Sequence, residues 1–326
     1  MSARIPVWSR VVFLVLLPFV LYSAWDVVES RRLQSRLDAL DASRQLAAPQ
    51  SGRPPAETLQ AERFYRAAAA LVTTERIASR REDLDANREA FDLVDRAAHL
   101  PFRSFVPGAS YNFLAGDLAK LAHSLEYRAG IELHDNRADA AVTSFFSEAR
   151  LMRALDAASG GNLSMMPRFA GLGAAMSAGA RSPARPALAA ALADLDRDDR
   201  LKSVLIDGRA KMLLNSTVAF MGPSRRTGNP FGVRIAVQQL DAFASLIAVA
   251  DAPWPARIDA MNAVDLFPYG FATKNPGSSL ALRNFTKSIA GQVKTIRCAR
   301  LITSTTPLDL IDPFTGTRLE PSSCRL

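Results

Sequence analysis

The chain has few of the side chains on which most metal and catalytic sites depend. Its 326 residues include three histidines, His99, His123 and His134, and two cysteines. The histidines are too few and too badly spaced for a zinc site on a helix, and the sequence has no His-Glu-x-x-His motif. It also lacks a Gly-x-Ser-x-Gly motif, a phosphate-binding loop and a Gly-x-Gly-x-x-Gly fingerprint. We therefore expect no cofactor and no metal, and no motif names a catalytic residue.

Two further patterns are missing. Although the net charge is +8, no dense basic motif with interleaved aromatic residues occurs, so we expect no nucleic acid partner. The abundance of arginine and alanine is typical of a GC-rich bacterial genome and explains the charge without a polyanionic ligand. Asp194, Asp196 and Asp198 match the opening of a calcium loop, but Asp199 replaces the required glycine and Leu205 the bidentate glutamate. We expect these acids to cap and charge a helix N-terminus.

No run of alternating apolar and polar residues predicts a substantial sheet, whereas apolar residues recur at helical spacing through most of the chain. With 48% hydrophobic residues, the chain can form a packed core. The sequence therefore predicts an all-α protein: an N-terminal transmembrane helix, an irregular body of helical hairpins and a short irregular C-terminal tail. Helices are expected at 27–46, 56–80, 82–100, 114–133, 136–158, 163–179, 186–195, 200–221, 233–250, 253–264 and 280–302.

The longest apolar run, residues 11–24, is short for a membrane span, which needs about 20 residues. It becomes long enough if residues 5–28 form one helix, with Arg10 reaching back to the lipid headgroups and Asp26 at the far boundary. Aromatic residues that suit the membrane interface bracket the run: Trp8, Tyr22 and Trp25. The sequence thus predicts an uncleaved anchor in a lipid bilayer.

Two alternatives to the anchor remain open. A cleaved signal peptide would also have basic residues before a short apolar core, but cleavage after Ala24 would place Tyr22 where a small residue is preferred. A buried helix of a soluble protein is the other alternative. Basic residues nearly balance across the run, and with a very short N-terminal tail we expect the N-terminus inside and the body exported. The predicted location is a bacterial inner membrane, single-pass, with a periplasmic body.

The predicted domain organisation follows composition. Residues 1–28 form the cytoplasmic tail and anchor, 29–46 a membrane-proximal helix and 47–56 a proline-rich linker. The helical body covers 57–305, with a subdivision near 160 or near 222 left open, and the C-terminal tail covers 306–326. If the body is exported, Cys298 and Cys324 are expected to form a disulfide that ties the tail to the preceding helix, whereas in the cytoplasm they would be two thiols.

The pair of helices expected at 114–158 contains alanines alternating with large apolar residues around a tight polar turn. It is interpreted either as one degenerate tetratricopeptide-like unit or as an isolated helical hairpin, since no second copy occurs at the period of about 34 residues. In the tail, Asp312, Pro313 and Gly316 predict a tight structural turn, because aspartate can cap it and glycine permits a positive φ.

That turn, together with the YRAA stretch at 65–68 and the hairpin sequence LEYRAGIEL…AAVTSFFSEARLMRAL, resembles a loose group of bacterial single-pass envelope proteins. The resemblance implies a mainly helical body behind one membrane anchor and a C-terminal DPF-x-G-type turn. It implies no activity.

Two loops supply the candidate binding residues. Arg225 and Arg226, in a loop bounded by glycine and proline, suit an anion or the carboxylates of a partner, although a solvated pair would have the same sequence. The other candidates are Phe267, Tyr269 and Phe271, because aromatic residues on loops often form interfaces; aromatic residues buried under the loop would look the same.

The predicted function is binding: a membrane-anchored interaction or assembly module whose partner is another envelope protein. One alternative is an envelope enzyme with acids such as Glu126, Glu132 or Glu148 brought together between helices. Another is a ligand-binding sensor with a closed apolar cavity.

Overall fold

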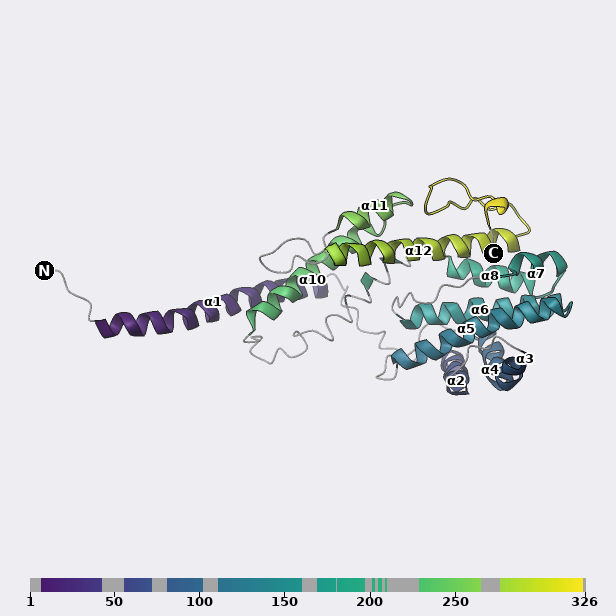
Figure 1. Cartoon of the computed structure of the whole chain (residues 1–326), viewed down its shortest axis with the longest axis horizontal. Coiled ribbons are helices and arrows are strands. Elements are labelled where there is room, and N and C mark those ends of the chain that lie inside the picture. Colours follow the sequence, from purple (N-terminus) through teal and green to yellow (C-terminus); the bar gives the residue numbers. More distant parts are fainter. Residues whose placement is uncertain are drawn as a thin grey trace. The chain divides into compact units, whose positions relative to one another are not determined.

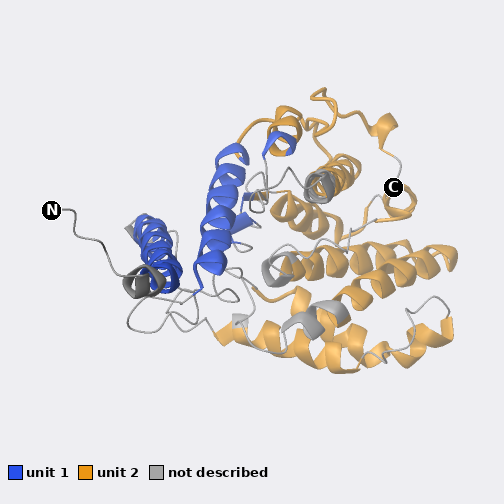
Figure 2. Cartoon of the chain, turned by 60° about the vertical axis from the view of Figure 1, so that its left-hand side comes forward, with its two compact units in different colours: residues 1–51, 202–250, 262–281 blue, residues 52–201, 251–261, 282–326 orange. Residues whose placement is uncertain are grey.

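The computed structural model describes residues 7–42, 56–71, 81–101, 111–159, 169–179, 181–196, 201–202, 205–206, 209, 229–264 and 276–324. The chain divides into two compact units (Figure 2). Unit 1 comprises residues 1–51, 202–250 and 262–281, and unit 2 comprises 52–201, 251–261 and 282–326. The predicted all-α fold is confirmed: the described residues form helices and contain no strand (Figure 1). In the described part of the tail, Ile311 and Arg318 form an isolated antiparallel bridge.

Unit 1 is built on two long helices, α1 (Val7–Ala42) and α10 (Pro230–Val249). The predicted anchor and membrane-proximal helix form one continuous helix, α1, with Pro18 inside it. Helix α10 begins at a favourable N-terminus, because the Asn229 side chain accepts a hydrogen bond of 3.1 Å from the Gly232 amide and Pro230 opens the first turn. Leu33 of α1 is fully buried against the α10 side chains Val233, Ala236, Val237 and Leu240.

Unit 2 begins with α2 (Ala56–Leu71), α3 (Arg81–Ala86) and α4 (Arg88–Ala98). The single helix expected at 82–100 is wrong, since the chain breaks at Asn87. The Asn87 side-chain amide donates a 2.8 Å hydrogen bond to the carbonyl of Asp83. Such a local bond from an asparagine side chain competes with continuous helix formation.

The helical hairpin expected at 114–158 is present as α5 (Tyr111–His134) and α6 (Ala138–Ser159). Asn136 makes the turn with φ = 59°, a left-handed conformation that asparagine tolerates. The Arg137 amide then donates a 2.8 Å hydrogen bond back to the carbonyl of Glu132, which closes the end of α5. Buried alanines on both helices, including Ala129 and Ala141, keep the interface thin so that the two backbones lie close.

The rest of unit 2 follows this hairpin in the chain. It includes α7 (Leu172–Ala178), α8 (Arg185–Leu195), most of α11 (Ala256–Ala263), the part of α12 (Pro276–Thr303) from residue 282 onward, and the short 3-10 helix η2 (Pro321–Ser323). Helices α7 and α8 both pack on α6. The core is formed mainly by leucine, alanine and phenylalanine; among its fully buried members are Leu118, Leu125, Phe145, Leu151, Phe169, Leu172, Leu188 and Leu192.

Candidate functional site

The N-terminal half of α1 presents an exposed apolar surface. Eight large apolar side chains in succession or near succession are 43–68% exposed: Phe13, Leu14, Val15, Leu16, Phe19, Val20, Leu21 and Tyr22. Soluble proteins rarely leave so many adjacent large apolar side chains in water. By length and composition, this helix is apolar enough to cross a membrane, as is α10. These are the two helices of this kind in the part of the chain that the structure describes.

Beyond Trp25 the surface of α1 becomes mainly polar, although Val28 is still 47% exposed. The next turn brings the buried acids Asp26 and Glu29, and the Glu29 carboxylate accepts hydrogen bonds of 3.2 Å from the Trp25 indole and from Arg32. Glu29 is only 2% exposed, so the indole and the guanidinium compensate for the burial of its charge. This turn marks the boundary between the apolar half and the polar half of α1.

Helix α10 packs along the polar half of α1 and runs parallel to it. The Trp25 ring meets the Phe231 ring at 4.4 Å between centroids, edge to face. Farther along both helices, the Arg36 guanidinium lies 2.8 Å from the Asp241 carboxylate. The two helices therefore run in the same direction, and the N-terminus of α10 lies level with Trp25. We name Tyr22, Trp25 and Phe231 the aromatic cluster, because Tyr22 and Trp25 also meet edge to face at 6.3 Å.

A second candidate lies in unit 2, where α4, α5 and α6 share a partly buried polar network. Arg128 donates to Asp95 at 2.9 Å and to Glu132 at 3.1 Å. The hydroxyl of Ser144 donates to Glu132 at 2.6 Å, and that of Ser147 donates to Asp95 at 2.7 Å. Burial alone would lower the pKa of Arg128, but the charges and hydrogen bonds of both carboxylates raise it. Every charge in this network has a partner, so it joins the three helices.

The three acids proposed for an enzyme have different surroundings. Glu132 belongs to the paired network, whereas Glu148 is fully buried and its Oε2 atom has no hydrogen-bond partner. Burial, reinforced by the nearby charge of Glu126, raises the pKa of Glu148 well above its ordinary value. Glu126 in turn accepts a 2.9 Å hydrogen bond from the Ala170 amide, and its carboxylate lies 3.8 Å from the Nδ1 atom of His123. We name Glu126 and Glu148 the acid pair.

No group of three or more histidine, cysteine, aspartate or glutamate side chains suited to a metal ion occurs among the described residues. Of the three aspartates expected at a helix N-terminus, Asp194 and Asp196 lie at the C-terminal end of α8, and Asp198 lies outside the described residues. Asp196 is instead held by Arg297 at 3.2 Å and by Arg300, both on α12. The aspartate thereby ties α8 to α12.

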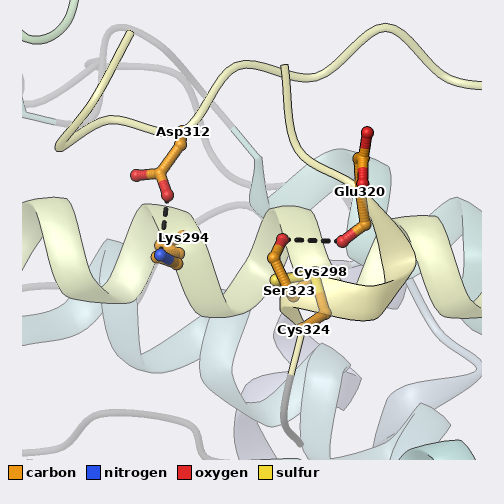
Figure 3. Close-up of a disulfide and its surroundings, with 6 residues drawn as sticks. All are labelled: Lys294, Cys298, Asp312, Glu320, Ser323 and Cys324. Carbon is orange, nitrogen blue, oxygen red and sulfur yellow. Dashed lines mark hydrogen bonds and ion pairs between the residues drawn. A yellow bond between two sulfur atoms is a disulfide. The ribbon is translucent and has the colours of Figure 1, made fainter. Parts of the chain in front are cut away.

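A disulfide and an ion pair both fix the C-terminal tail to α12 (Figure 3). Cys298 and Cys324 form a disulfide with 5.3 Å between their Cα atoms. Lys294 donates to Asp312 at 2.6 Å. Burial alone would raise the pKa of Asp312, but the hydrogen bond and charge of Lys294, together with the Phe314 amide, lower it. The tail therefore belongs to the packed body.

Within the tail, residues 312–316 form a tight turn around Pro313. The Asp312 carboxylate accepts a 2.8 Å hydrogen bond from the Phe314 amide, and the Asp312 carbonyl accepts one of 2.8 Å from the Gly316 amide. Gly316 has φ = 71°, a conformation that glycine adopts at little cost.

The two loops that carry the other predicted binding residues, Arg225 with Arg226 and Phe267 with Tyr269 and Phe271, lie outside the described residues. Of the polar network, the sequence analysis named only Glu132; it did not identify Asp95, Arg128, Ser144 or Ser147. The spacing of Arg128 and Glu132, four residues apart on a helix, was the only signal that pointed to it.

Comparison with known proteins gives no match: no family model, no curated protein and no solved structure is significantly similar to this chain. The resemblance to bacterial envelope proteins accordingly stays an expectation from sequence.

Proposed function

We propose that this chain is a single-pass, membrane-anchored protein of a bacterial inner membrane, and that its exported helical body binds another envelope protein. The observation that carries the anchor is the exposed apolar half of α1, where eight large apolar side chains are 43–68% exposed. Complete burial of a large apolar side chain is worth about 1.5–3 kcal/mol. Because these eight side chains are on average a little over half exposed, their transfer into lipid would contribute roughly 7–14 kcal/mol. That gain is enough to hold the helix in a bilayer.

A single crossing is favoured by the way α10 packs. Because α10 lies parallel to the polar half of α1 and level with it, both segments would have to share the same depth in a membrane. The polar half of α1 carries five charged side chains within ten residues: Glu29, Arg31, Arg32, Arg36 and Asp38. Placing them in hydrocarbon would cost on the order of 10 kcal/mol. In this arrangement α10 stays outside the hydrocarbon, although it is apolar enough to span.

An exported body is favoured by the disulfide between Cys298 and Cys324, because such bonds persist in oxidising compartments and are rare in the cytosol. The bond closes a separation of 26 residues in the chain and fixes the tail to the last helix. An N-terminus on the cytoplasmic side, followed by α1 and a periplasmic body, accommodates both the anchor and the disulfide.

The partner can be sought by quantitative co-purification from gently solubilised membranes. The full chain is compared with a chain ended at residue 55 and fused to an unrelated exported domain, which keeps the anchor and removes the body. We expect one envelope protein near stoichiometric amounts with the full chain and its absence from the control. Repeated recovery of the same proteins with both chains would contradict a binding role for the body.

The acid pair favours a second candidate, a ligand-binding sensor or enzyme with its site between helices. A fully buried carboxyl with one unpartnered oxygen is the kind of group that binding sites contain. A screen of small cations and amines by thermal shift, repeated with Glu148→Gln, tests it. A ligand that stabilises the wild type and not the variant would support this candidate, and stabilisation of both to the same extent would contradict it.

A further inference from the structure

The aromatic cluster joins α10 to the place where α1 leaves its apolar half. Trp25 contacts Tyr22 on one side and Phe231 on the other. Tryptophan and tyrosine concentrate at the membrane interface, where their rings meet both lipid and water. If α1 crosses a bilayer, Trp25 therefore lies in the interfacial layer on the side of the body, and Phe231 lies at the same depth.

The first two turns of α10 leave two apolar side chains partly uncovered, although one of them, Phe231, also contacts Trp25 of α1. Phe231 is 54% exposed and Ile235, one turn later, is 37% exposed. Both lie on one face, since residues four apart on a helix are neighbours. Val233 and Ala236 on the opposite side are buried against α1. The exposed apolar pair occurs at the end of α10 that lies nearest to the apolar half of α1 (Figure 1).

Charge on the adjacent turn of α1 suits the same surface. Arg31 is exposed, and the Arg32 side chain is 63% exposed although its guanidinium bonds to Glu29. These guanidinium groups begin six residues beyond Trp25, which is about 9 Å along the helix and within the headgroup layer. Arginines at that depth attract the phosphates of anionic lipids.

We propose that the N-terminal end of α10 is a second membrane contact, in which Phe231 and Ile235 insert into the interfacial layer of an anionic phospholipid bilayer beside Trp25. This inference rests on the proposed anchor and adds to it. The single helix α1 would leave the body free to rotate and tilt about the anchor. A second contact on a helix packed against α1 fixes how the helix pair stands on the membrane surface.

Depth measurement with fluorescent probes tests the proposal on the full chain. Single cysteines replace Leu16, Phe231, Ile235 or Ala248, and each is labelled under non-reducing conditions, in which the native disulfide does not react. The labelled chains are reconstituted into vesicles of phosphatidylethanolamine and phosphatidylglycerol with nitroxide quenchers attached near the headgroup or deep in the acyl chain. Leu16 lies about 14 Å along α1 from Trp25, and Ala248 lies about 25 Å along α10 from Phe231.

We expect the probes at Phe231 and Ile235 to be quenched by the headgroup nitroxide, the probe at Leu16 by the deep nitroxide, and the probe at Ala248 by neither. The Ile235→Cys chain keeps the contact between Trp25 and Phe231, so it reports depth even if replacement of Phe231 loosens the helix pair. Quenching at Leu16 without quenching at Phe231 or Ile235 would overturn this inference and leave the anchor standing. Loss of quenching at Leu16 would overturn the anchor and, with it, this second contact.

Discussion

Replacing Glu148 with glutamine should change how the free energy of unfolding of the body depends on pH. The Glu148 carboxyl is fully buried, its Oε2 atom has no hydrogen-bond partner, and burial together with the charge of Glu126 raises its pKa well above the ordinary value. An ionised carboxylate without a partner would be very costly at such a site. The folded protein therefore holds this carboxyl protonated at a pH where the unfolded chain has already released the proton.

The sign of the effect follows from proton binding. Below about pH 4 the carboxyl is protonated in both states and contributes no pH dependence. Above that, the unfolded state binds fewer protons than the folded state, so the free energy of unfolding falls by about 1.4 kcal/mol per pH unit. The decline continues until the pH reaches the raised pKa of the folded state. In Glu148→Gln the side chain ionises in neither state, and this contribution disappears.

The assay is urea-induced unfolding of the full chain in detergent, followed by helical circular dichroism from about pH 5 to about pH 7.5. We expect the free energy of unfolding of Glu148→Gln minus that of the wild type to increase by as much as ~1.4 kcal/mol per pH unit across this range. A difference in the free energy of unfolding that stays the same at every pH would report only how well the glutamine amide fits the site. The exposed Glu89→Gln change controls for the loss of one formal charge. Parallel pH profiles for the wild type and Glu148→Gln would refute the reasoning.

Three further changes test the packing of the body by the same unfolding assay. Cys324→Ser should lower the free energy of unfolding by about 3.5 kcal/mol, from the loop that the bond to Cys298 closes; a loss equal to that caused by dithiothreitol on the wild type is expected, and no loss would contradict it. Asp196→Asn removes the carboxylate that two arginines, 9% and 22% exposed, share, and it should cost about 3–5 kcal/mol. A cost below that of a surface ion pair, about 1 kcal/mol, would contradict this expectation. Gly316→Ala should cost about 1–3 kcal/mol, because φ is 71° and the added Cβ would lie 2.8 Å from the Cδ atom of Pro255; an unchanged unfolding midpoint would contradict it.

Local features of the fold were predictable because they depend on neighbours in sequence. The apolar run at 11–24 predicted the exposed half of α1, and helical spacing around a polar turn predicted the hairpin of α5 and α6. The break at Asn87 was missed because a single asparagine inside a periodic pattern gives no strong stop signal, and only its side-chain bond to Asp83 interrupts the helix.

Long-range features were not predictable. The contact between Trp25 and Phe231 joins residues about 200 positions apart, and no periodicity links them. The arginines that bind Asp196 lie on α12, 101 and 104 residues later in the chain. Because no local pattern points to them, sequence alone placed this aspartate at a helix start. Glu148 was named as an acid, but its complete burial depends on which side of α6 the surrounding helices cover. Such burial is decided by tertiary packing, which a single sequence does not reveal.

The central claim is that α1 anchors an exported body, and the sidedness of two introduced cysteines tests it most directly. Ser2→Cys marks the N-terminus and Glu57→Cys marks the start of the body, and each is treated in intact spheroplasts with a membrane-impermeant maleimide. The account predicts that Glu57→Cys is labelled at once and that Ser2→Cys is labelled only after lysis. Labelling of Ser2→Cys before lysis, or protection of both positions until lysis, would contradict the account.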